Sequence, residues 1–183
     1  QRENTALHKW QLDENWRPVS KEHLATIDNG VLISPMVVYS DIVYVLAKIN
    51  GIRSLLSISL QTGDTALLLT ETSGFSPYKI TDSDDESSIA LLGFDSHHIS
   101  QVKHFSIETA DITSIATLDA NWYFIDKHPL EKGYLLSDGK SLFMLTAAGK
   151  LQSISFENYK FLHYPTLSDN GKRLAFTQAN IKG

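Results

Sequence analysis

Four short runs of aliphatic, aromatic and β-branched residues recur along the 183-residue chain at nearly constant spacing, and this repeat limits the fold more than any other feature. The runs begin at residues 42, 89, 134 and 174, so successive starts lie 47, 45 and 40 residues apart. A fixed period of this length is typical of proteins in which each repeat is one supersecondary unit stacked on its neighbours. We therefore expect an array of such units.

Each of the first three runs is followed by a second strand-like segment, a turn and a returning strand. Alternation of apolar and polar residues with a period of two indicates strands, and the Gly or Asp in each turn tolerates the left-handed backbone of a tight hairpin. The turns are residues 61–64, 108–111 and 147–150, and the returning segments are 66–69, 112–118 and 151–154.

A proline marks the first strand of three of the repeats. Pro35, Pro77 and Pro165 each precede one of the runs, and Pro77 and Pro165 lie 88 residues apart, which is two periods of 44. The period matches the roughly 40–45 residues of a four-stranded β-propeller blade. We predict an all-β chain of about three and a half blades of four antiparallel strands, forming an incomplete ring. The predicted blades are 30–74, 75–119, 120–160 and a partial blade at 161–183.

The first 29 residues are polar, and we interpret residues 1–29 as an N-terminal arm. One strand near residues 23–27 could complete a blade, and the open edges could pair with a second copy in a homodimer. The chain starts without Met or an apolar leader, so we expect it to be a piece of a longer protein.

Composition excludes several function classes. The formal net charge of −5, from 21 acidic and 16 basic residues, argues against nucleic-acid binding. The absence of cysteine excludes disulfides, thiolate zinc sites and a cysteine nucleophile, and no apolar stretch is long enough to span a membrane. No nucleophile elbow, phosphate-binding loop or zinc-protease motif occurs, so we expect no catalytic residue, cofactor or metal site.

Three groups of residues are candidate sites, and each has a structural alternative. His97 and His98 with Asp95 could bind a metal, but adjacent strand residues point to opposite faces, so a solvated loop is preferred. Residues 82–86 are acidic and could bind Ca²⁺, but the order of ligands is not that of an EF-hand, so a hairpin tip is preferred. Exposed aromatic residues could bind a partner, although packing between blades explains most aromatics in such a chain. The candidates for partner contact are Trp10, Trp16, Trp122 and Tyr123.

The last repeat resembles a known family. Residues 167–176, with the sequence LSDNGKRLAF, resemble the SPDGKxLAF signature of TolB-like propeller repeats, although Asp169 stands at the usual Pro and Asn170 at the usual Asp. Residues 57–63 resemble another stretch of the same repeats. Residues 16–20, with the sequence WRPVS, resemble the opening of the periplasmic part of CadC-like membrane-anchored winged-helix transcriptional regulators.

The resemblance implies a non-catalytic binding or sensing module, the periplasmic sensor part of such a regulator, which binds a protein or small ligand at a propeller face or open edge. A cytoplasmic location is the alternative for the compartment. Two other settings of these repeats stay open. The chain could be the propeller of a prolyl-oligopeptidase-like serine peptidase, or a TolB-like cell-envelope scaffold.

Overall fold

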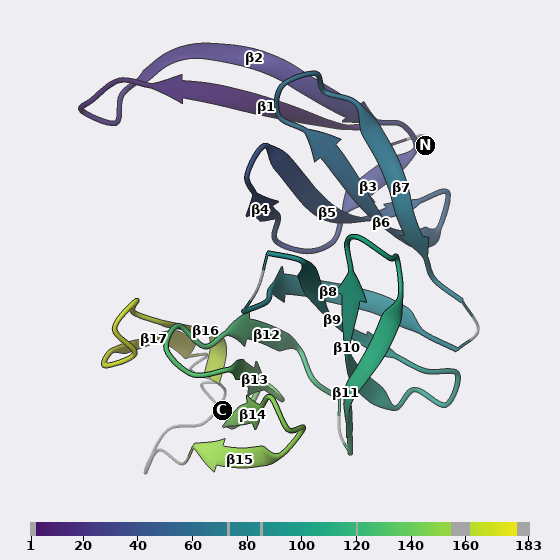
Figure 1. Ribbon diagram of the computed structural model, residues 1–183, viewed down its shortest axis with the longest axis vertical. Coiled ribbons are helices and arrows are strands. Elements are labelled where there is room, and N and C mark those ends of the chain that lie inside the picture. Colours follow the sequence, from purple (N-terminus) through teal and green to yellow (C-terminus); the bar gives the residue numbers. More distant parts are fainter. Residues whose placement is uncertain (1–2, 73, 85, 120, 155–161, 179–183) are drawn as a thin grey trace, which may run out of the picture. The chain divides into compact units, whose positions relative to one another are not determined.

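The computed structural model describes residues 3–72, 74–84, 86–119, 121–154 and 162–178, and within these ranges every regular element is a β-strand (Figure 1). No described segment is a helix of the length and apolar character that a membrane crossing requires. The chain divides into two units, residues 1–72 and residues 73–183. The all-β prediction is confirmed.

The first unit contains a sheet of five strands, in which two short strands share one partner. Both β3 and β4 pair with β5, at its two ends, so they take the place of one interrupted inner strand. The interruption contains Pro35, which has no N–H to donate to a ladder. The strands are β3 (Gly30–Leu32), β4 (Val37–Tyr39), β5 (Ile42–Ile49), β6 (Ile52–Ser59) and β7 (Thr65–Thr70).

A two-stranded hairpin precedes this sheet. Strands β1 (Thr5–Leu12) and β2 (Pro18–Ile27) pair antiparallel over almost their whole length. The segment expected as an arm with one strand thus contains two, because β1 pairs with β2. The base of the hairpin packs on one face of the five-stranded sheet, and this contact forms a buried core. Its members are Leu7, Ala25, Ile27, Val43, Val45, Ala47, Leu56 and Ile58.

The described residues of the second unit form two sheets of four strands and one of two strands, each with its strands in chain order. Sequential antiparallel strands of this kind are the meander of a propeller blade. The first sheet has β8 (Ser76–Asp82), β9 (Ser88–Phe94), β10 (Ser100–Ser106) and β11 (Ile112–Leu118). The second has β12 (Phe124–Lys127), β13 (Gly133–Ser137), β14 (Leu142–Thr146) and β15 (Leu151–Ile154). The third has β16 (Leu162–Leu167) and β17 (Leu174–Gln178).

Two of the marker prolines lie in edge strands at irregularities of the ladder. The register of β8 against β9 shifts just after Pro77, and the register of β16 against β17 shifts between His163 and Thr166, on either side of Pro165. Proline lacks a backbone donor, so edge strands and bulges are the positions at which a sheet tolerates it. The same property explains why proline marks the first strand of some of these repeats, although β12 contains none.

The turn of the TolB-like motif connects β16 to β17. The Gly171 amide donates to the Ser168 carbonyl oxygen at 2.7 Å, and Gly171 has a φ of 63°. The Arg173 amide donates to the Ser168 side-chain oxygen at 3.1 Å. The predicted tight hairpin is therefore present. The ends of the third and fourth predicted blades, residues 155–160 and 179–183, lie outside the described residues.

Candidate functional site

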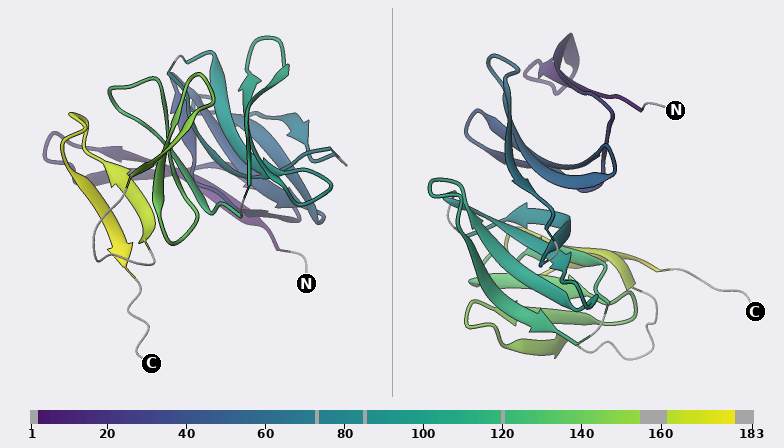
Figure 2. Two further views of the ribbon diagram at one scale, coloured as in Figure 1. Left: turned by 90° about the horizontal axis from the view of Figure 1, so that it is seen from below. Right: turned by 90° about the vertical axis from the view of Figure 1, so that its right-hand side faces the viewer.

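Hairpin β1–β2 holds two of the four predicted partner-contact residues. Its loop end extends past the strands of the sheet in the same unit (Figures 1 and 2). Because side chains alternate between the faces of a strand, the hairpin has an inner face, which continues the core contact, and an outer face. The paired residues of the outer face are His8 with His23 and Trp10 with Lys21, and Leu12 follows on the same face of β1 by alternation.

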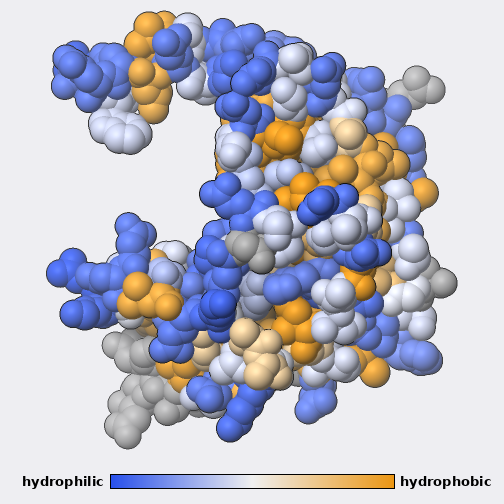
Figure 3. Space-filling model, viewed as in Figure 1, coloured by the Kyte–Doolittle hydropathy of each residue, from blue (hydrophilic) through white to orange (hydrophobic). Residues whose placement is uncertain are grey.

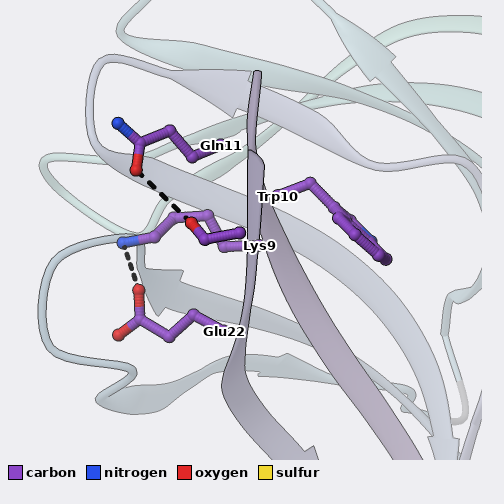
Figure 4. A pocket seen from close by; sticks show the side chains of 5 residues that line it. Lys9, Trp10, Gln11 and Glu22 are labelled. Atoms are coloured by element: carbon purple, nitrogen blue, oxygen red, sulfur yellow. Dashed lines mark hydrogen bonds and ion pairs between the residues drawn. The ribbon is translucent and has the colours of Figure 1, made fainter. Parts of the chain in front are cut away.

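The inner face changes from apolar to polar along the hairpin. Leu7 and Ala25 are buried, whereas the next pairs toward the loop are Lys9 with Glu22 and Gln11 with Ser20. These four residues and Trp10 line an open concavity of about 300 Å³. Figure 4 shows Lys9, Gln11 and Glu22 on one side of β1 and the Trp10 ring on the other.

Lys9 fastens the hairpin to the sheet. Its Nζ donates to the carbonyl oxygen of Leu60, directly after β6, at 2.9 Å, and lies 3.1 Å from Oε2 of Glu22. An exposed ion pair contributes little to stability by itself. The bond to a backbone carbonyl nevertheless places the hairpin at a defined position over the end of β6.

On the outer face, Trp10 is exposed and carries a cation beside its ring. Lys21 Nζ lies 5.6 Å from the Trp10 ring centre, within the range of a cation–π contact. The exposed fraction of Trp10 is 52%. Most of the surface at this end of the hairpin is hydrophilic, with a hydrophobic patch between (Figure 3), and Leu12 and Val19 are the exposed aliphatic residues there.

Trp16 lies in the turn between β1 and β2 and is 81% exposed. Asp13 organises the turn, because its Oδ1 accepts hydrogen bonds from the amides of Asn15 at 2.8 Å and Arg17 at 2.9 Å. Trp16 adopts a φ of 61°, a left-handed backbone that bulky residues rarely occupy. His98 adopts the same backbone, with a φ of 60°, in the turn between β9 and β10, so this φ belongs to the turn, and the exposure of Trp16 makes it a candidate contact residue.

The other two predicted contact residues lie in the second unit, and only one of them is at the surface. Trp122 is 3% exposed and packs edge-on against Phe143 at 4.8 Å between ring centres. Its backbone oxygen accepts a hydrogen bond from the Tyr78 hydroxyl. Tyr123, the next residue, is 58% exposed. The structure thus places Trp122 in the core between two sheets, which is the packing alternative, and leaves Tyr123 available for contact.

The histidine pair lies in the turn between β9 and β10. Asp95 Oδ1 accepts hydrogen bonds from the amides of His97 at 2.8 Å and Ile99 at 2.9 Å. These bonds, first that from Ile99, hold the pKa of Asp95 below its ordinary value. The carboxylate therefore organises the turn. No group of three metal-ligating side chains occurs in the part of the chain that the structure describes.

The acidic segment 82–86 connects β8 to β9, and its member Asp85 lies outside the described residues. Asp82 Oδ2 lies 3.5 Å from Lys127 Nζ on the inner strand of the next sheet. Beside it, the half-buried Asp126 was not singled out from the sequence. Burial, together with the charge of Asp82, raises the pKa of Asp126. The sequence feature that could have identified Asp126 is its position directly after the strand-like pair Phe124–Ile125, where an acidic residue is unusual.

Comparisons with known proteins give the fold and no family. No family model matches the chain, and no curated protein matches it. A chain of a nidogen–laminin complex superposes with a TM-score of 0.71 at 14% identity, over 94% of this chain and 66% of that one. TolB from Acinetobacter baumannii superposes with a TM-score of 0.69 at 13% identity, over 94% of this chain and 43% of that one. A puromycin hydrolase superposes with a TM-score of 0.58 at 12% identity, over 94% of this chain and 29% of that one.

The present chain therefore spans less than half of that TolB and less than a third of that hydrolase. Identities this low carry information on architecture only. The four-stranded meanders and these similarities together lead to one conclusion: the chain has a TolB-like β-propeller fold, with blades of four antiparallel strands.

Proposed function

We propose that the chain is a non-catalytic recognition module that binds a protein partner through the outer face and turn of hairpin β1–β2. The observation that carries the proposal is the exposure of two tryptophans on this one hairpin, Trp10 at 52% and Trp16 at 81%. Buried tryptophans are among the residues that contribute most to protein interfaces. A partner with apolar pockets would bury both rings, and Lys21 adds a positive charge beside Trp10.

The turn favours binding because it is already organised. Asp13 holds the backbone on both sides of Trp16, so little conformational entropy remains to be lost at that backbone when a partner binds.

The setting that we propose is the periplasmic sensor part of a membrane-anchored transcriptional regulator. The supporting residues are Trp16 to Ser20, which resemble the opening of such sensor parts and which form the turn and the start of β2. Partner binding at this segment would alter how the membrane-tethered halves associate. An upstream membrane span and winged helix in the parent gene are expected, and a parent gene without them would exclude this setting.

The similarities to TolB and to a puromycin hydrolase favour one alternative each: a cell-envelope scaffold and the propeller of a serine peptidase. The parent gene distinguishes these as well. A Gly-x-Ser-x-Gly nucleophile elbow downstream would indicate the peptidase. A signal peptide directly upstream, with capture of an outer-membrane lipoprotein, would indicate the scaffold.

Site-specific photo-crosslinking tests the recognition surface itself. Benzoylphenylalanine is placed at position 10 or 16 of the full-length parent protein in its native cells, with position 67 as the matched control. Leu67 is 60% exposed on β7 of the same unit and lies outside the hairpin. We expect one discrete protein adduct from positions 10 and 16 and none from position 67. Equal adducts from all three positions, or none from 10 and 16, would contradict the proposal.

A further inference from the structure

Two histidines face each other across hairpin β1–β2. His8 on β1 is the direct register partner of His23 on β2, and both side chains are exposed on the outer face. Their ring centres lie 5.7 Å apart, with an angle of 80° between the ring planes. A register shift between Leu7 and His8 sets this pairing, so the two rings meet because of a local irregularity of the ladder.

This separation is close to that of two imidazoles on one metal ion. A ligating nitrogen lies about 2.0–2.1 Å from zinc, which puts each ring centre roughly 3 Å from the ion and, at a tetrahedral angle, the two ring centres about 5 Å apart. The observed 5.7 Å therefore needs to close by less than 1 Å. Exposed side chains can make such an adjustment by rotation about χ1 and χ2 without moving the backbone.

Thr26 supplies a second contact of the kind found around metal-binding histidines. Nε2 of His23 lies 2.8 Å from Oγ1 of Thr26, three residues further along β2. When Nε2 carries the proton and donates it to Thr26, Nδ1 carries the lone pair that a metal requires. Ligating histidines commonly donate their other N–H in this way, which fixes the tautomer and the ring orientation.

We propose that His8 and His23 chelate one divalent transition-metal ion of the class that prefers imidazole, such as Zn²⁺ or Cu²⁺. Water completes the coordination, because the site is exposed and the described residues contain no cluster of three metal-ligating side chains around it. The ion links β1 to β2 on the same face as Trp10 and Lys21.

Calorimetric titration of the intact chain with ZnCl₂ at neutral pH tests the site. We expect one ion per chain, and we expect each of the single variants His8→Ala and His23→Ala to bind it about tenfold or more weakly. Thr26→Val should weaken binding by up to about tenfold, as losses of such outer contacts do. The matched control is His97→Ala with His98→Ala, which removes two exposed histidines from the turn after β9 and should leave the affinity unchanged.

A measurement on the unaltered chain keeps the test independent of variant folding. Cu²⁺ is paramagnetic, so substoichiometric Cu²⁺ should broaden the NMR signals of His8 and His23 before those of other histidines. First broadening at His97 and His98, or zinc affinity retained when both His8 and His23 are replaced, would overturn the proposal. Neither measurement contains a protein partner, so a failure here is distinguishable from a failure of the proposed recognition function.

Discussion

The hydroxyl oxygen of Thr81 on β8 lies 3.4 Å from Oδ1 of Asp126 on β12, so two polar side chains connect the inner strands of neighbouring sheets. The Lys127 amide also donates to the same carboxylate oxygen at 3.0 Å. Asp126 is half-buried, and burial is the largest cause of the raised pKa of this carboxyl. The inner edge of the second unit therefore contains a carboxylate that is destabilised in its charged form.

This relationship predicts how stability depends on pH. The folded-state pKa of Asp126 lies above the ordinary value of 3.8, so folding favours the protonated form. The contribution is fully present below pH 3.8 and is lost as pH rises through the raised folded-state pKa. Replacing Asp126 with Asn removes the titration, so the free energy of unfolding of D126N should fall less than that of the unaltered chain as pH rises from about 4 to 7.

Chemical denaturation at a series of pH values measures the difference, with Asp84→Asn as the control because Asp84 is exposed in the turn after β8. D84N should follow the unaltered chain. Parallel curves for D126N and the unaltered chain would show that Asp126 does not titrate differently on folding.

Two glycines with left-handed backbones should respond differently to alanine. Gly63 has a φ of 75°, and a Cβ there would overlap the carbonyl oxygen of Leu24. Gly51 has a φ of 89° but nothing within 4 Å of the added atom. We expect Gly51→Ala to cost about 1 kcal/mol from backbone strain alone, and Gly63→Ala to cost about 2–4 kcal/mol because strain and overlap add. Urea unfolding measures both, and equal costs would mean that the Leu24 backbone shifts freely.

The neighbours Trp122 and Tyr123 should differ sharply in their effect on stability. Trp122 is 3% exposed in the core of the second unit, whereas Tyr123 is 58% exposed. Trp122→Ala leaves a cavity between two sheets and should cost about 3–5 kcal/mol. Tyr123→Ala should change the free energy of unfolding by no more than about 0.5 kcal/mol. A Trp122 variant as stable as the Tyr123 variant would contradict the placement of Trp122 in the core.

Trp16 should show opposite effects on stability and on binding. Asn tolerates a left-handed backbone better than Trp, so Trp16→Asn should keep or raise the free energy of unfolding, by up to about 1 kcal/mol. The same change should abolish the photo-crosslinked adduct of position 10, read by gel mobility. A lower free energy of unfolding would contradict the expected relief of backbone strain, and an adduct that persists would contradict a role of Trp16 in partner binding.

The strand runs that begin at residues 42, 89 and 134 were predictable because their residues are buried in a regular pattern. In β5, β9 and β13, runs of β-branched and aliphatic residues are buried on both faces, and their hairpin turns contain Gly, Asp or Asn. Hairpin β1–β2 was harder, since most of its side chains are exposed and leave no apolar period to detect. The interruption between β3 and β4 was equally invisible, although Pro35 lay within it.

The candidate sites show the same limit. The predictions for Trp10 and Trp16 rested on residue type, and their exposure depends on a hairpin that the sequence did not indicate. His8 and His23 lie 15 residues apart, and only a register with a shift beside His8 brings them opposite each other. Asp126 depends on packing between two sheets, which a single sequence does not specify. In each case the sequence gives the type of side chain, whereas strand register and packing between sheets decide which side chains lie next to it.

The anchoring of the hairpin has a mechanical consequence. Besides the core contact at its base, the hairpin touches the segment that leads from β6 to β7 twice: Lys9 donates to the Leu60 carbonyl, and the Leu24 backbone lies against Gly63. The tip at Trp16 lies well beyond them along the strands. A force applied at the tip would therefore reach residues 60–63 through Lys9 before it reaches the core contact made by Leu7 and Ala25.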